Sequence, residues 1–357
     1  MSLPLHRKAL IAAAAAVGSA CLPTRACVSL PGRPAALEHA GVRVGDRWLA
    51  IDVLYDDARL GSITQIVKRA NGELAIVGTK AAIFLPSAGG TAAARAVRFA
   101  EPAGHPELVE WPDGQPRFVD RGGGGWQTGA LIDVDGRRLW QPERRDGMDD
   151  LAAGDVDGDG LPEFVVGYNG GQGVHLLDAT GKARWAETDS NVWHVDIVDT
   201  DGDGKAEIIH SNAAGQLTVR DARGKVLRRA GLSVSGYLSD FSLVRWPPPE
   251  AGVLHSGDGA TEILGFDGKV RASLVTPDSP SLGEASGVAA RFGADDYLVL
   301  ALSARSWDRT QLFVFDKGGA LRYREVVVGN CRAVAAPEPD AFLFGCGTRV
   351  WRYKNRP

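Results

Sequence analysis

The chain has 357 residues, of which 44% are apolar and 24% are charged, and its formal net charge is -4 at pH 7. This composition is typical of a globular protein, and the lack of a basic excess argues against a nucleic-acid partner. The 45 glycines favour many short strands that are joined by tight turns.

The first twenty residues are typical of an export signal. His6, Arg7 and Lys8 precede a short apolar run at residues 10–17, and small residues follow it. The run is too short to span a bilayer as a helix, whereas its order of positive, apolar and small residues is the order found in signal peptides. We therefore predict a signal peptide at residues 1–20 and a tether at residues 21–46.

Cys21 is a candidate lipidation site. The pair Ala20-Cys21 resembles a bacterial lipobox, although Gly18 stands where that motif prefers leucine. Ordinary cleavage after Ala20 is the alternative. A lipidated Cys21 would anchor an otherwise soluble chain to a membrane surface. The predicted location is therefore the periplasm, or the outer membrane as a lipoprotein.

A repeated turn is the most informative feature of the sequence. An acidic residue followed by a glycine and a strand-like run recurs at Gly136, Gly181, Gly224, Gly268 and Gly318, with spacings of 43 to 50 residues. A period of this length, built of short strands, predicts the blades of a β-propeller.

Each repeat has the pattern of a β-hairpin. Residues 173–178 form an apolar run, the next residues supply a turn with Gly181, and Ala183 and Trp185 then alternate with polar neighbours. This order predicts a buried strand, a tight turn and an outer strand. Four such strands make one blade, and stacking the blades in a ring buries their faces.

The periodicity predicts an all-β fold, a single β-propeller domain over residues 47–357 that is expected to be monomeric. Six complete blades are predicted, at residues 60–100, 105–145, 149–187, 190–230, 235–276 and 284–328. The tail at residues 330–354 holds three more strand candidates, and the strand-like residues 48–55 can supply a fourth. Pairing of this N-terminal strand with the C-terminal blade would close a seven-bladed ring; six or eight blades are the alternatives.

Two adjacent blades contain an Asp-rich loop. Loop 1 spans residues 155–163 and loop 2 spans residues 199–207; both read D-x-D-x-D-G-x-x-E, and they are 44 residues apart. Carboxylates at positions 1, 3, 5 and 9 and a backbone carbonyl at position 7 supply the hard oxygens that calcium prefers, and calcium tolerates irregular geometry better than magnesium does. We therefore predict two calcium sites. The predicted ligands are Asp155, Asp157, Asp159, Leu161 and Glu163 in loop 1, and Asp199, Asp201, Asp203, Lys205 and Glu207 in loop 2.

These loops are not EF-hands, because β-prone residues follow them and no acid at position 12 closes them. In-phase Asp-rich loops on blades of about 44 residues resemble FG-GAP/VCBS repeats, the calcium-loop repeats of integrin α-chains and of many bacterial exported proteins. The resemblance covers residues 149–230. It implies calcium binding by the acids of both loops, and glutamate at position 9 is a departure from the aspartate that is frequent in the family.

Cys331 and Cys346 are predicted to form a disulfide across a hairpin, as an oxidising envelope would allow. Closing a 15-residue loop in this way stabilises a fold by about 3 kcal/mol on the chain-entropy model. Two buried free thiols are the alternative.

The sequence shows no catalytic constellation, and we predict no catalytic residue. The nine tryptophans are interpreted first as packing between blades, with sugar stacking as the alternative. The predicted function is that of a calcium-stabilised, envelope-associated module that binds or scaffolds a protein or glycan partner. A carbohydrate-active propeller enzyme, such as a polysaccharide lyase or a glycosidase, is the alternative.

Overall fold

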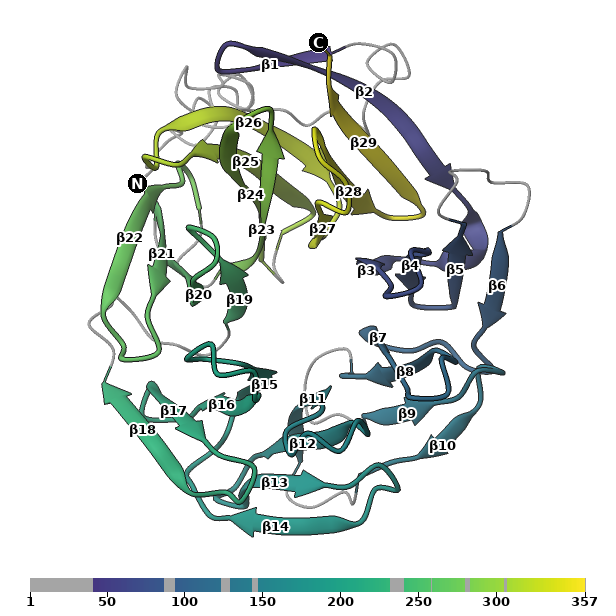
Figure 1. The fold of residues 1–357 in the computed structure, drawn as a ribbon, viewed down its shortest axis with the longest axis vertical. Helices are drawn as coiled ribbons and strands as arrows, with labels where there is room; N and C mark the ends of the chain where they lie inside the picture. The colour runs from purple at the N-terminus through teal and green to yellow at the C-terminus, as the bar shows by residue number, and fades with distance from the viewer. Residues whose placement is uncertain are drawn as a thin grey trace, which may run out of the picture.

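The computed structural model describes residues 41–86, 94–122, 129–142, 147–231, 241–257, 259–279, 283–304 and 307–356. They form seven antiparallel sheets that are arranged as blades around a ring (Figure 1). The predicted seven-bladed propeller is confirmed. The predicted signal peptide and Cys21 lie outside the described residues. Within the described ranges, no helix has the length and hydropathy needed to cross a membrane.

Six blades consist of four strands that are consecutive in the sequence. The first blade contains β3 (Ile63–Lys68), β4 (Leu74–Gly78), β5 (Ala81–Leu85) and β6 (Arg95–Arg98). The second contains β7 (Pro106–Val109), β8 (Arg117–Asp120), β9 (Ala130–Ile132) and β10 (Arg138–Trp140). The third contains β11 (Met148–Gly154), β12 (Glu163–Tyr168), β13 (Gly173–Leu177) and β14 (Ala183–Glu187).

The next three blades follow the same order, with the first strand near the centre of the ring and the fourth at its rim (Figure 1). The fourth blade contains β15 (His194–Val198), β16 (Glu207–Ser211), β17 (Gln216–Arg220) and β18 (Val226–Gly231). The fifth contains β19 (Ser242–Arg245), β20 (Ala251–Gly257), β21 (Ala260–Leu264) and β22 (Val270–Val275). The sixth contains β23 (Glu284–Phe292), β24 (Asp295–Ser303), β25 (Arg309–Asp316) and β26 (Leu321–Val328).

The seventh blade joins the two ends of the chain. Its order is β1-β2-β29-β28-β27, with β1 (Gly41–Val44) and β2 (Arg47–Asp56) from the N-terminal side and β27 (Ala333–Ala335), β28 (Ala341–Cys346) and β29 (Arg349–Asn355) from the C-terminal side. The predicted closure of the ring is confirmed. A short 3-10 helix, η2 (Ala58–Leu60), leads into the first blade.

Two ion pairs reinforce the β2–β29 seam. The guanidinium of Arg352 lies 2.6 Å from Asp52, and that of Arg349 lies 2.8 Å from Asp56. Strand β1 pairs with β2 beyond this seam, so the sheet begins at Gly41, upstream of the predicted domain boundary at residue 47.

The inner strands are buried because each blade lies between two others. Every residue of β12 is buried, whereas most residues of the rim strand β14 are exposed. The apolar core accordingly lies between blades: Val165 and Val174 of the third blade pack with Val195 and Ile208 of the fourth. Burial on both faces explains why the inner strands read as continuous apolar runs.

The turn glycines of the repeat have two roles. Gly181 and Gly224 have φ values of +85° and +84°, a conformation that other residues adopt with strain. They also touch the preceding blade: an added Cβ would lie 2.9 Å from the Trp140 ring at Gly181 and 3.1 Å from the Trp185 ring at Gly224. The same contact recurs between Gly136 and Arg98, Gly268 and Ala230, and Gly319 and Leu274. The glycine that marks the repeat therefore marks a contact between blades.

In the sixth blade the left-handed glycine is Gly319, with φ +80°, rather than Gly318, which the repeat predicted. The longer spacing arises because the strands of this blade are longer, with nine residues in β24 and eight in β25.

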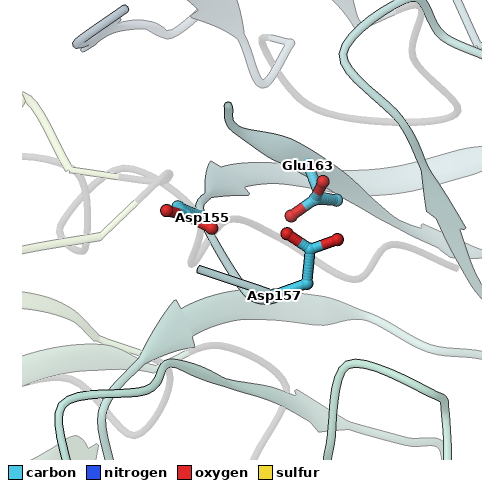
Figure 2. Close-up of side chains that lie close together, drawn as sticks. All are labelled: Asp155, Asp157 and Glu163. Carbon is cyan, nitrogen blue, oxygen red and sulfur yellow. The ribbon is translucent and has the colours of Figure 1, made fainter. Parts of the chain in front are cut away.

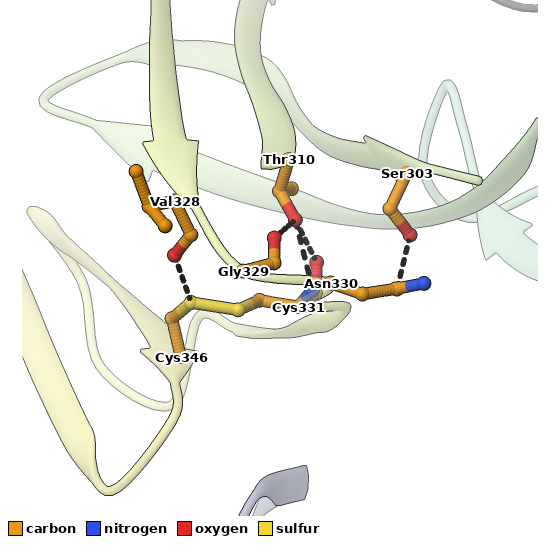
Figure 3. The surroundings of a disulfide bond; sticks show 7 residues. All are labelled: Ser303, Thr310, Val328, Gly329, Asn330, Cys331 and Cys346. Carbon is orange, nitrogen blue, oxygen red and sulfur yellow. Dashed lines mark hydrogen bonds between the residues drawn. A yellow bond between two sulfur atoms is a disulfide. The ribbon is translucent and has the colours of Figure 1, made fainter. Parts of the chain in front are cut away.

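Cys331 and Cys346 form a disulfide with a Cα–Cα distance of 5.0 Å (Figure 3). It joins the segment before β27 to the end of β28. The Thr310 hydroxyl donates to the Gly329 carbonyl at 2.7 Å and accepts from the Cys331 amide at 2.8 Å. The disulfide is thereby tied to β25 of the neighbouring blade.

Replacing Gly181 by alanine is expected to destabilise the ring by more than the backbone strain alone. Gly171 is a matched control, because its φ is +82° and an added Cβ would meet nothing within 4 Å. Gly171→Ala should cost about 1 kcal/mol, and Gly181→Ala should cost a further 1–3 kcal/mol, roughly, because the Trp140 ring must move. Urea unfolding of both variants measures the difference, and equal losses would show that the contact between blades is unimportant.

Candidate metal centre

The two Asp-rich loops occupy the same place in adjacent blades. Loop 1 connects β11 to β12, and loop 2 connects β15 to β16. Both therefore join the first two strands of a blade, and each ends in a glutamate that begins the second strand.

Each loop wraps around the carboxylate of its first aspartate. Asp155 accepts hydrogen bonds from the backbone N–H groups of Gly158 at 2.7 Å and Gly160 at 2.9 Å. These two glycines have φ values of +80° and +85°, so the chain can curl tightly enough to present both amides to one side chain.

Loop 2 repeats this arrangement. Asp199 accepts from the backbone N–H groups of Gly202 at 2.6 Å and Gly204 at 3.0 Å. These backbone hydrogen bonds hold the pKa of Asp199 below its usual value. Its carboxylate is therefore ionised and available to a cation at neutral pH.

Three acidic side chains converge in each loop, with one ligand oxygen from each within 4.8 Å of the others. Oxygens that share one calcium ion at 2.3–2.6 Å lie at most about 5.2 Å apart, so the donor sets fit that ion. Figure 2 shows the carboxylates of loop 1 turned toward one another. The clusters contain Asp155, Asp157 and Glu163 in loop 1, and Asp199, Asp201 and Asp203 in loop 2.

The clusters differ from the predicted ligand sets at the fifth and ninth positions. Asp159 is outside the loop 1 cluster, and Glu207 is outside the loop 2 cluster. Glu207 instead accepts from the backbone N–H of Thr200 at 2.9 Å and from its hydroxyl at 2.7 Å. The predicted ligands at position 7, Leu161 and Lys205, follow the turn glycines.

In each loop, the backbone of the residue at position 7 is hydrogen-bonded to the aspartate at position 5. The backbone N–H of Leu161 donates to Asp159 at 2.7 Å, and that of Lys205 donates to Asp203 at 2.8 Å. Their carbonyl groups stay predicted ligands.

Arg184 of β14 contacts the carboxylates of loop 1, and no feature of the sequence predicts this contact. Its Nη1 donates to Asp157 and lies 3.1 Å from Oε1 of Glu163. Burial raises the pKa of Glu163, which is 1% exposed, whereas the hydrogen bond from Arg184 lowers the pKa of Asp157. No local motif links Arg184 to the loop, because 27 residues separate it from Asp157.

A second charged cluster ties three blades together near the centre of the ring. Arg121 follows β8, and its guanidinium lies 2.7 Å from Asp150 of β11 and donates to the Val195 carbonyl of β15 at 2.9 Å. His194 Nδ1 lies 2.6 Å from the same Asp150 carboxylate. Arg121 also lies 3.3 Å from Glu107 of β7. We call these five residues the Arg121 cluster.

Neighbouring charges and burial together determine the pKa values of the carboxylates in and beside the Arg121 cluster. Burial opposes ionisation of Glu107, but Arg121 and His105 outweigh it and lower the pKa of Glu107 to about 2. Arg121 and His194 likewise overcome burial and hold the pKa of Asp150 well below its usual range. Burial dominates at Asp196, whose pKa is raised despite Arg121.

Comparison with known proteins places the FG-GAP-like repeat on the two loops. The family model described as an FG-GAP-like repeat matches residues 155–210, which include both metal loops. A search of curated proteins finds no match to this chain. The chain is thus a seven-bladed β-propeller that contains an FG-GAP-like repeat in its third and fourth blades.

Several solved structures share the fold at low sequence identity. BBS1N in complex with ARL6DN is 13% identical with a TM-score of 0.56, and the match covers 88% of this chain and 98% of that one. A streptogramin B lyase is 8% identical with a TM-score of 0.55, with 86% and 98% covered. The extracellular domain of BT4673 from B. thetaiotaomicron is 11% identical with a TM-score of 0.54, with 87% and 43% covered. At these identities the likeness extends to the fold alone.

The Arg121 cluster predicts a loss of stability in acid. Glu107 and Asp150 have folded-state pKa values below those of the unfolded chain, which are about 4. Their contribution is complete above about pH 5 and is lost as the pH falls toward 2, because the unfolded state binds protons first. The measurement is urea unfolding from pH 7 to pH 3 in EDTA.

Arg121→Met should lower the free energy of unfolding at pH 7 by about 3–5 kcal/mol, since it removes the guanidinium that the buried Asp150 and the partly buried Glu107 share. The substitution should also reduce the change in the free energy of unfolding between pH 7 and pH 3. Arg291→Met is the control, because Arg291 is 62% exposed in its pair with Asp296 and such pairs contribute about 0–1 kcal/mol. Similar losses in the two variants would contradict the assigned role of Arg121.

Proposed function

We propose that the chain is a calcium-stabilised propeller that binds or scaffolds a protein or glycan partner at the cell envelope. The convergence of three aspartates in loop 2, at the same place as the loop 1 cluster in the adjacent blade, is the observation that supports this most strongly. Calcium would be held by Asp199, Asp201 and Asp203 in loop 2, and by the corresponding cluster in loop 1. The ion would offset the repulsion between carboxylates and fix the connection between the first two strands of each blade.

A binding role fits the way in which the acidic residues are used. The first aspartate of each loop stabilises the turn by accepting hydrogen bonds from backbone N–H groups. The best-clustered acids therefore have a structural role. The related folds include a propeller in a protein complex and a lyase, so the fold alone does not separate binding from catalysis. Trp140 and Trp185 pack on turn glycines of the next blade, which supports their predicted packing role.

The envelope location rests on two independent features. Residues 1–20 have the order of a signal peptide and Cys21 follows them. The disulfide between Cys331 and Cys346 is the kind of bond that persists in oxidising compartments. A lipid at Cys21 would hold the propeller at a membrane surface, and comparing the membrane-bound fraction of the full chain with that of Cys21→Ala tests this anchor.

Calcium is expected to raise the free energy of unfolding of the full chain. With 1 mM calcium and a Kd of about 0.1–1 mM, each occupied loop contributes roughly 0.4–1.4 kcal/mol. Thermal unfolding in calcium and in EDTA measures this, and Asp201→Ala should remove the contribution of loop 2. Asp135→Ala, which alters an exposed turn outside both loops, should keep the full response. A melting temperature that is the same in calcium and EDTA would refute the calcium role.

If the chain is a binding module, it should retain a carbohydrate partner without cleaving it. The full chain is incubated with an array of envelope polysaccharides in calcium, and both retention and the release of new chain ends are measured; cross-linking in intact cells covers protein partners. Retention without new ends supports a binding module. New chain ends, from hydrolysis or elimination, would establish the alternative enzyme.

A further inference from the structure

The two metal loops have the same backbone but different neighbours on the rim strand. In β14 the pairing register skips Arg184, since Leu176 pairs with Trp185 and Leu177 with Ala183. In β18 the register skips Leu227 in the same way, between the pairs of Arg228 and Val226. Arg184 and Leu227 therefore stand at corresponding positions of adjacent blades. One is a cation and the other is an apolar side chain that is 52% exposed.

Arg184 already compensates the charge of loop 1. Its guanidinium contacts both Asp157 and Glu163, two of the three members of the cluster. The Glu163 side chain is 1% exposed, and an ionised carboxylate at such a site requires a cationic partner or a metal. The guanidinium supplies one positive charge to these two carboxylates, whereas a calcium ion would supply two.

Loop 2 is arranged differently around its glutamate. Glu207 accepts from the N–H and hydroxyl of Thr200, which are both neutral donors, whereas loop 1 has Val156 at that position, with a backbone N–H alone. Among the described residues, no arginine or lysine forms an ion pair with the three aspartates of the loop 2 cluster. These aspartates converge as the calcium motif predicts, while in loop 1 Asp159 stays outside and Glu163 takes its place.

We propose that Arg184 acts as an internal cation for loop 1, so that the two loops are unequal and loop 2 binds calcium first. Calcium can enter loop 1 only by displacing the guanidinium from Asp157 and Glu163. This inference rests on the proposed calcium function. The contacts that must be broken are hydrogen bonds between charged groups, so loop 1 is expected to bind about ten- to a hundredfold more weakly than it would without Arg184.

The inference is tested by exchanging the two residues that differ. Calcium binding to the full chain is measured by titration calorimetry, with loop 1 isolated by Asp201→Ala and loop 2 isolated by Asp157→Ala. Adding Arg184→Leu to the first background should tighten calcium binding by loop 1 about ten- to a hundredfold. Arg184→Lys, which keeps the charge, should stay close to the weak binding of the parent.

The reverse exchange tests the idea on the other loop. Leu227→Arg in the Asp157→Ala background introduces a cation at an exposed position, where folding should be undisturbed, and should weaken calcium binding by loop 2. Unchanged affinity in both exchanges, with loop 2 still binding calcium, would overturn the role of Arg184 and leave the calcium function intact. Absence of calcium binding by either loop in every variant would instead refute both.

Discussion

The structure depends on the burial of each blade between two neighbours. A four-stranded sheet whose inner strands are apolar on both faces cannot be stable alone. Here the core side chains of adjacent blades form common clusters, and Val165 and Ile208 belong to one of them. Such stacking leaves two uncovered faces unless the ring closes. The pairing of β2 with β29 closes it, so residues at opposite ends of the chain, such as Asp52 and Arg352, become direct partners.

The same constraint explains what the sequence could predict. The turn glycine must be left-handed and must fit against the preceding blade, as Gly224 fits against Trp185. It therefore recurs in the second to the sixth blade and reveals the period. The metal loops were predictable because their acids lie within nine residues, so local spacing brings three of them together in each loop. The Cys331–Cys346 pair also joins segments that are close in sequence.

The closure of the ring was predictable because the repeat leaves the last blade one strand short, whereas side-chain contacts between residues far apart in sequence could not be predicted. Arg121 reaches Asp150 and Val195, which are 29 and 74 residues away, and neither distance follows a motif. Strand β1 was not predicted, because it forms only by pairing with β2 at the outer edge of the seventh blade. Arg184 belongs to the same class: its sequence position shows a rim-strand residue, and only the register shift in β14 directs it toward the loop.

The two repeats that carry metal loops therefore share the backbone geometry of the loop more closely than they share the charges around it. The hydrogen bonds of Asp155 and Asp199 to their turn glycines have equivalent partners and nearly equal lengths, because the turn conformation requires them. The residues around the carboxylates carry no such requirement, so one blade provides an arginine and the next a leucine. Similar loops on one ring can then differ in cation affinity while the fold stays the same, and function in such a propeller must be argued separately for each blade.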